Sequence, residues 1–183
     1  MKADGVHFRR VVGSPRPQRV IETRLIRLML ESGAVVVCAG GGGIPVLRNE
    51  YGHRVGVEAV IDKDLTAAVL AEHLEADFLM ILTDVPSIIE GFGTDDAKPL
   101  TRATPKSLRS IDFPAGSMGP KVEAVCRFVE LTGDAAAIGR LEDAAEIIAG
   151  TAGTIITPGG DYGGPNDIQI PIPPPTNARK ART

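Results

Sequence analysis

Residues 19–39 read RVIETRLIRLMLESGAVVVCA, and this stretch decides the fold class. Its first part carries apolar side chains at helical spacing: Ile21, Leu25, Leu28 and Met29. Gly33 then stands where a glycine ends a helix. The following run, Ala34 to Ala39, is short, wholly apolar and rich in valine. Such a run predicts a strand buried on both faces, which is typical of a parallel sheet covered by helices.

The same alternation of helix and strand continues along the chain. A second helix is expected at about Glu58 to Leu74, before a strand at Phe78 to Leu82, and a third after Pro120, before a strand near Ala135 to Ile138. A last helix is expected at Leu141 to Ile148, and a last strand at Thr154 to Ile156. This order predicts an α/β fold, a three-layer αβα sandwich with a mainly parallel sheet.

Length and composition predict a soluble globular domain. The chain has 183 residues, 43% of them hydrophobic, and a formal net charge of −3. Nucleic acid is excluded as an expected partner because no broad positive charge is present. The apolar runs are shorter than the ~18 residues of a membrane span, and MKADGVHFRR does not resemble a secretory signal, so we expect a cytoplasmic protein.

Cysteines and histidines show no metal-ligand spacing. Cys38 and Cys126 lie in apolar stretches without a CxxC pair, which predicts reduced thiols in the core. The histidines are scattered, and we assign them to the surface or to packing: His7, His53 and His73. No protein-held metal is therefore expected.

The composition changes after Pro158. Residues 159–183 are rich in glycine and proline and end with basic residues, so we predict a disordered tail after a domain at 1–158. The IPIPPP segment is an alternative candidate for a polyproline ligand.

Four glycines, Gly40, Gly41, Gly42 and Gly43, follow the expected strand. Glycines at the carboxyl end of a parallel strand let backbone N–H groups approach an anion. The loop is a candidate cradle for phosphate or carboxylate, and a tight turn is the alternative. It has neither the Gly-Lys-Ser/Thr ending of a Walker A loop nor GxGxxG spacing.

Asp62-Lys63-Asp64 is the second candidate. Asp64 belongs to a row of small and apolar residues on the expected helix, where a carboxylate needs a partner. One interpretation is a solvated charge pair near a helix start. The other is an aspartate that orients lysines, including Lys63, around a phosphate group.

Two further segments carry polar groups at positions suited to a ligand. AGSMGPK at 115–121 predicts a helix start, with Pro120 at the first helical position and Ser117 or Gly119 near the cap. Lys121 in that first turn opposes the helix dipole unless an anion binds there. Thr83 and Asp84 end the strand from Phe78, where an aspartate either turns the chain or faces a nucleotide.

In chain order, several segments resemble carbamate kinases of the amino-acid kinase family: RRVV at 9–12, GGGGIPV at 40–46, VEAVIDKD at 57–64, LTDV at 82–85 and GSMGPKV at 116–122. The resemblance covers Arg9 to about Pro158 and corresponds to the C-terminal, nucleotide-binding part of that family, with the N-terminal part missing. Pro86 after the TDV element and Gly13 depart from the family pattern.

The resemblance implies phosphoryl transfer between ATP and carbamate, giving ADP and carbamoyl phosphate, in a homodimer that serves arginine deimination. It implies that Asp64 organises the active-site lysines and that Lys63 and Lys121 neutralise the phosphoryl group. Thr83 and Asp84 would line the nucleotide pocket with Met118 and Gly119 nearby, and the glycine loop would lie near the acceptor.

Mg²⁺ would be carried by the nucleotide. Because the acceptor-side elements of the family are missing, the isolated chain is expected to show no turnover. The alternatives are a non-catalytic nucleotide-binding or dimerising remnant, and another amino-acid kinase such as a UMP kinase.

Overall fold

In the computed structural model, the described residues are 2–4, 7–9, 11–113 and 118–159. A four-stranded sheet forms the centre of the fold. Its strands, in spatial order, are β5 (Phe78–Thr83), β9 (Ala135–Arg140), β10 (Thr154–Ile156) and β8 (Arg102–Ala103). β5 pairs with β9 and β10 pairs with β8 in parallel, whereas β9 and β10 are antiparallel. The sheet is therefore mainly parallel, as the sequence predicts.

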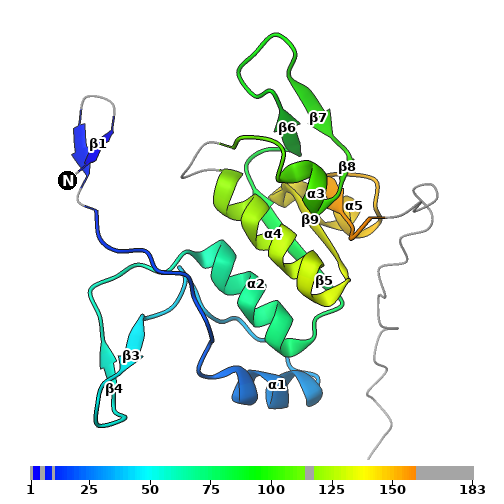
Figure 1. The fold of residues 1–183 in the computed structure, drawn as a ribbon. Coiled ribbons are helices and arrows are strands. Elements are labelled where there is room, and N and C mark those ends of the chain that lie inside the picture. The colour runs from blue at the N-terminus through cyan, green and yellow to red at the C-terminus, as the bar shows by residue number, and fades with distance from the viewer. Residues whose placement is uncertain (1, 5–6, 10, 114–117, 160–183) are drawn as a thin grey trace, which may run out of the picture.

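Helices cover both faces of this sheet. α2 (Lys63–Leu74) and α4 (Met118–Thr132) pack against each other and against one face (Figure 1). The opposite face carries the short helix α5 (Ala144–Ile148), which follows the 3-10 turn η1 (Leu141–Asp143). Alternate residues of β9 divide between the two layers, with Ile138 facing α4 and Ala137 facing α5. The three-layer αβα prediction is confirmed.

The larger core lies between α2, α4 and the sheet. Phe128, Val125 and Val129 of α4 are fully buried there, against Ile138 and Ile156 from the strands. Each buried side chain of this size contributes roughly 1.5–3 kcal/mol of transfer free energy. This packing fixes the ends of α2 and α4 relative to the strands, and those ends carry the candidate residues.

Smaller elements surround the sandwich. α1 (Thr23–Glu31) contacts α2, and α3 (Pro105–Leu108) contacts α4. The remaining strands form three antiparallel hairpins: β1 (Lys2–Asp4) with β2 (His7–Arg9), β3 (Val46–Arg48) with β4 (Arg54–Gly56), and β6 (Ile88–Glu90) with β7 (Lys98–Leu100). The hairpin β3–β4 projects away from the sandwich (Figure 1). None of the described helices has the length and apolar character needed to cross a bilayer.

The prediction of a buried strand at Ala34 to Ala39 is wrong for this structure. The segment forms no strand, and the side chains of Val35 and Val37 are 94% and 98% exposed. A strand needs a neighbour for its backbone groups, and in the described part of the chain none lies beside this segment. Cys38 is consequently exposed, which corrects its assignment to the core.

Cys126 behaves as the sequence predicts. It lies in α4, its side chain is buried, and burial raises the pKa of its thiol to about 11. The group is therefore a neutral thiol at physiological pH. The predicted tail lies almost wholly outside the described residues, so it stays a prediction.

The second helix begins five residues later than the sequence pattern predicts, at Lys63 rather than Glu58. The side chain of Asp62 accepts hydrogen bonds from the backbone N–H groups of Asp64 and Leu65, at 2.8 and 3.0 Å. This is an N-cap, and its extended backbone stops the helix from continuing toward the N-terminus. At the other end, Glu75 adopts a left-handed conformation with φ of 57° and ends the helix.

Candidate functional site

The topology brings the N-terminal ends of α2 and α4 to one edge of the sheet. α2 ends three residues before β5 begins, and α4 ends two residues before β9 begins. Each helix therefore runs antiparallel to the strand that follows it. Twelve helical residues span about 18 Å and six strand residues about 20 Å, so each helix begins near the carboxyl end of its strand. In open α/β sheets that edge forms the ligand crevice.

Asp64 and Lys121 meet at this edge. Lys121 Nζ lies 2.9 Å from Asp64 Oδ2, and the two side chains are only 16% and 11% exposed. The partners are 57 positions apart in the sequence, so the ion pair joins the first turn of α2 to the first turn of α4. This low exposure excludes the alternative of a solvated charge pair, and the expectation that Asp64 needs a partner is confirmed.

Lys63 is placed differently. It is the first residue of α2 and is exposed, and among the described residues the lysine that pairs with Asp64 is Lys121. The proposed role of Lys63 at a phosphate is untested by the structure, as are the roles of Asp64 and Lys121.

The glycine loop lies against the beginning of α2. The Thr66 hydroxyl donates to the carbonyl oxygens of Gly42 and of Asp62, both at 3.0 Å. Gly40, Gly42 and Gly43 have φ values of 45°, 124° and 88°, a region that L-residues rarely adopt. The loop is thus a turn held beside Asp62, Lys63 and Asp64, although no strand precedes it as the sequence predicts.

Gly42 allows a close approach that no other residue permits. A methyl group at this position would lie 2.1 Å from the carbonyl oxygen of Ile61. We expect Gly42→Ala to lower the free energy of unfolding by about 1–3 kcal/mol, because both the contact and the backbone angle become strained. Gly41→Ala is the matched control, since open space surrounds its added methyl group. Urea denaturation of the two variants measures the difference, and equal stabilities would contradict this placement of the loop.

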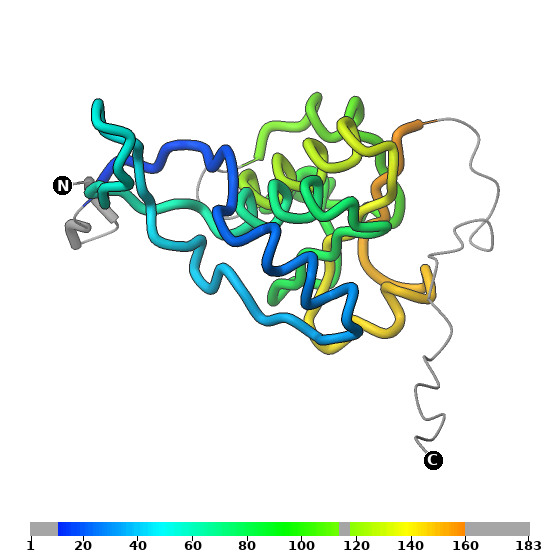
Figure 2. The backbone as a smooth tube through the Cα atoms, turned by 90° about the horizontal axis from the view of Figure 1, so that it is seen from below, coloured from blue at the N-terminus to red at the C-terminus, as the bar shows by residue number. Residues whose placement is uncertain are grey.

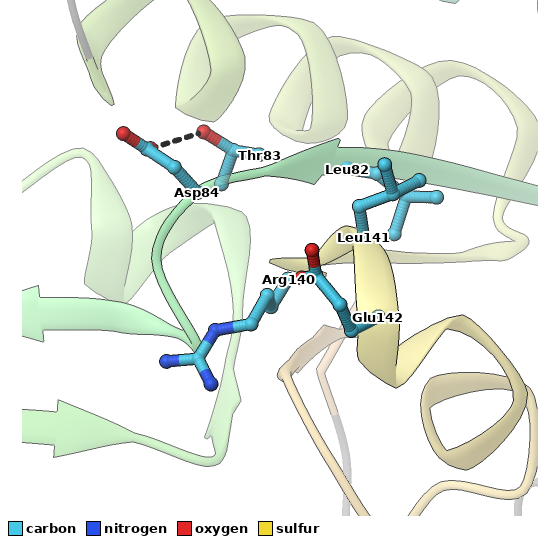
Figure 3. Close-up of a pocket in the computed structure, with 6 residues that line it drawn as sticks. All are labelled: Leu82, Thr83, Asp84, Arg140, Leu141 and Glu142. Atoms are coloured by element: carbon cyan, nitrogen blue, oxygen red, sulfur yellow. Dashed lines mark hydrogen bonds between the residues drawn. The ribbon is translucent and has the colours of Figure 1, made fainter.

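A pocket of about 640 Å³ opens where β5 and β9 end. Its lining comes from the ends of these adjacent strands and from the turn that follows β9: Leu82, Thr83, Asp84, Arg140, Leu141 and Glu142. Thr83 and Arg140 are register partners across the parallel pair, so the pocket lies at the carboxyl edge. The Thr83 hydroxyl donates to Asp84 Oδ1 at 3.0 Å (Figure 3). Thr83 and Asp84 therefore line a pocket, and their predicted contact with a nucleotide stays a prediction.

Sequence reasoning missed half of this lining. Arg140, Leu141 and Glu142 belong to no motif noted in the sequence. Arg140 ends β9, and Leu141 and Glu142 follow it. Their place in the pocket depends on the parallel pairing of β9 with β5, which only the fold reveals. In Figure 3 the guanidinium of Arg140 and the carboxylate of Asp84 lie at one side of the pocket, and Leu82 and Leu141 lie at the other. The pocket therefore combines a charged side with an apolar side.

α4 begins at Met118, two residues before the position that the sequence predicts. Pro120 is then the third helical residue, Gly119 the second, and Ser117 lies outside the described residues. Met118 packs against the main core and anchors this end of the helix. The first-turn N–H groups of a helix favour an anion, so this helix start presents partial positive charge beside Lys121, whose ammonium is paired with Asp64.

Within the described residues, no group of three or more His, Cys, Asp or Glu side chains is arranged to hold a metal ion. Asp64 is engaged by Lys121.

Comparison with known proteins places these features in context. The profile of the Amino acid kinase family matches residues 1–139. The carbamate kinase of Rhizobium meliloti (strain 1021) is 48% identical over 182 residues, covering 96% of this chain and 55% of that protein. The carbamate kinase of Haemophilus influenzae is 48% identical over 154 residues, covering 84% of this chain and 50% of that protein.

A solved structure agrees with these sequence relatives. The carbamate kinase from Giardia lamblia bound to AMP-PNP superposes with a TM-score of 0.78 at 38% identity, covering 80% of this chain and 53% of that one. The chain thus spans about half the length of the relatives it matches.

Proposed function

This chain belongs to the amino acid kinase family, and we propose that within the family it is the nucleotide-binding part of a carbamate kinase. The buried pair of Asp64 and Lys121, positioned by two helix N-termini at the carboxyl edge of the sheet, is the observation that carries the proposal. A buried ion pair gives little net stability, and such pairs are often replaceable by apolar residues. Its position at the ligand edge supports a role in binding an anion.

The pocket at Thr83 and Asp84 receives ATP or ADP in this proposal. Its apolar side, Leu82 and Leu141, suits a base, whereas Thr83, Asp84 and Arg140 offer hydrogen bonds and charge to a ribose or phosphate. The helix start at Met118 and Gly119 adds backbone N–H groups for the phosphates. The relative from Giardia lamblia, whose structure contains the ATP analogue AMP-PNP, supports this assignment.

Phosphoryl transfer depends mostly on positioning and on neutralising charge, and this chain offers groups for both tasks. Lys121 is oriented by Asp64 and contacts a phosphate oxygen of the nucleotide. Lys63, exposed at the start of α2, approaches the phosphoryl group from the solvent side. Thr66 holds the glycine loop next to α2, at the acceptor side. The N–H groups of Gly40 and Gly42 donate to the carbonyl oxygens of Cys38 and Ala39, so the acceptor meets those of Gly41 and Gly43. Mg²⁺ bound to the nucleotide phosphates supplies further charge neutralisation.

The substrates follow from the relatives. The curated proteins that match this chain at 48% identity are carbamate kinases, and we assign carbamate and carbamoyl phosphate to the acceptor side. Homodimerisation, a cytoplasmic location and a place in arginine deimination belong to the same proposal. Because the chain spans about half of each relative, a nucleotide-binding module without turnover of its own is the second candidate.

Nucleotide binding tests the proposal directly. We expect the purified chain to bind ADP weakly and to release heat on titration, because the pocket and both helix starts are in place. Isothermal titration calorimetry with ADP and with ATP is the measurement, and GTP at the same concentration is the control for specificity. Absence of both heat and a thermal shift at millimolar ADP would refute the assignment of this pocket.

An assay of ATP formation from carbamoyl phosphate and ADP then separates the two candidates. We expect the isolated chain to show no activity above that of Lys63→Ala. Turnover by the isolated chain that disappears in Lys63→Ala would show that these residues form a self-sufficient active site.

A further inference from the structure

β10 begins with a fully buried threonine, Thr154. The strand lies on the side of the molecule away from the hairpin β3–β4 (Figure 2). The register partner of Thr154, Ile138, and the next residue on the same face, Ile156, both belong to the main core, so the Thr154 side chain faces that apolar layer. A buried hydroxyl is favourable only where it is hydrogen-bonded, and valine has nearly the same shape without a polar atom. The bonds of Thr154 therefore explain why a threonine stands here.

Both bonds of this hydroxyl go to the base of the hairpin β6–β7. The hydroxyl accepts a hydrogen bond from the backbone N–H of Ile88 at 2.8 Å and donates one to the carbonyl oxygen of Leu100. Ile88 and Leu100 are register partners, the pair at which β6 begins and β7 ends. One side chain therefore joins both strands of the hairpin to the central sheet, across 66 and 54 positions of the sequence.

The two sides of the hairpin are held on β10 in different ways. After β7, the backbone continues the attachment, because β8 pairs with β10 and Ile155 N–H donates to the carbonyl oxygen of Thr101 at 2.9 Å. At the start of β6, the Thr154 hydroxyl holds Ile88. The side chain of Ile88 is fully buried, whereas that of Phe92 at the tip is 73% exposed. The hairpin is thus anchored at its base and extends away from the sandwich (Figure 1).

Thr154 also lies at the ligand edge of the sheet. β10 runs antiparallel to β9, and Ile138, the register partner of Thr154, is two residues before Arg140. Ile88, which the hydroxyl holds, is four residues after Asp84. Arg140 and Asp84 both line the pocket where β9 and β5 end. The hydroxyl therefore fixes the far end of the short segment that carries Asp84.

We propose that Thr154 is a positioning residue for the nucleotide pocket. Its hydroxyl fixes the start of β6 and, through residues 85–87, the conformation of Asp84, whereas Thr154 itself does not contact the nucleotide. Without the hydroxyl, this segment samples further conformations. The apparent affinity for ADP then falls with the fraction of molecules in which the pocket is correctly formed. The inference rests on the proposed function of this pocket as the site of ADP.

Thr154→Val removes the hydroxyl and keeps the shape of the side chain. The Ile88 N–H then lacks its partner, so we expect hydrogen exchange at the amides of Asp84 and Ile88 to become faster, as measured by NMR without nucleotide. We expect ADP to bind about three- to tenfold more weakly in calorimetry, which corresponds to the loss of one hydrogen bond.

Thr154→Ser separates positioning from packing. Serine retains the hydroxyl and loses the methyl group, so the variant is expected to unfold at a lower urea concentration while both hydrogen bonds remain. We expect its ADP affinity and its exchange at Ile88 to stay close to those of the unsubstituted chain. A structural role alone would instead make ADP affinity follow stability in both variants.

Thr132→Val is the matched control. The Thr132 hydroxyl also accepts a hydrogen bond from a backbone N–H, that of Asp134 at 3.0 Å, and donates one to a carbonyl oxygen, that of Phe128 at 2.9 Å. Thr132 is the last residue of α4, at the opposite end of the helix from Lys121. We expect Thr132→Val to lower stability and to leave ADP affinity unchanged.

Three results would overturn the inference. One is unchanged exchange at Ile88 in Thr154→Val, whatever the result with ADP. Another is unchanged ADP affinity in Thr154→Val while the unsubstituted chain binds ADP. The third is an equal loss of affinity in Thr154→Val and in either Thr154→Ser or Thr132→Val. Absence of ADP binding by the unsubstituted chain is a distinct result, because it refutes the proposed function itself and this inference with it.

Discussion

Phe128→Ala is expected to lower the free energy of unfolding by about 3–5 kcal/mol. Phe128 is fully buried in α4, at the contact between α2, α4 and the sheet. Removing the ring loses its transfer free energy and leaves a cavity that the surrounding side chains fill only in part. Domains of this size are stable by roughly 5–15 kcal/mol, so the variant is expected to be partly unfolded at modest urea concentrations.

Leu131→Ala is the matched control for this prediction. Leu131 lies one turn further along the same helix and is 57% exposed, so its truncation is expected to change stability by about 0.5 kcal/mol or less. Urea unfolding, followed by circular dichroism, measures the free energy of unfolding of both variants. The slope of this free energy against urea concentration is compared between the variants. Equal losses in the two variants would show that α4 does not present this face to the core.

Much of the fold could be predicted because its strands and helices carry their own local signals. Apolar runs mark β5, β9 and β10, and a glycine follows the end of α4. These signals are local, so they predict each element without knowledge of how the rest of the chain packs. The three-layer arrangement follows from their alternation. The hairpin β3–β4, by contrast, is short and mostly exposed, and its sequence lacks the strict alternation of apolar and polar residues from which a strand is predicted.

The error at Ala34–Ala39 has a different cause. The residues favour a strand, but a strand also requires a neighbour, and sequence propensity cannot report whether one is present. The candidate site was predicted only in part for the same reason, because some of its contacts join residues that are distant in the sequence. The composition around Asp64 predicted that it needs a partner, whereas the identity of that partner, Lys121, depends on the packing of α2 against α4. Arg140 lines the pocket beside Thr83 only because β9 pairs with β5.

Lys121→Ala is expected to weaken ADP binding by about 10- to 150-fold. A charge-assisted hydrogen bond to a phosphate contributes roughly 1.5–3 kcal/mol, and each 1.4 kcal/mol is a factor of ten. The variant also leaves the nearly buried Asp64 carboxylate without its cation, so stability is expected to fall as well. Calorimetry is therefore performed below the unfolding transition of the variant, which circular dichroism locates.

Two further variants separate the loss of the phosphate contact from the loss of stability. Lys106→Ala removes an exposed lysine from α3 and is expected to leave both ADP affinity and unfolding unchanged. Lys121→Arg keeps a cation beside Asp64, so it is expected to restore most of the stability while its broader, planar group restores ADP binding only in part. Full stability with unchanged ADP affinity in Lys121→Ala would mean that the ion pair neither supports the fold nor meets the nucleotide. A loss of stability alone, with ADP affinity intact in the folded variant, would mean that the ion pair has a structural role. Other residues of this edge would then bind the phosphate.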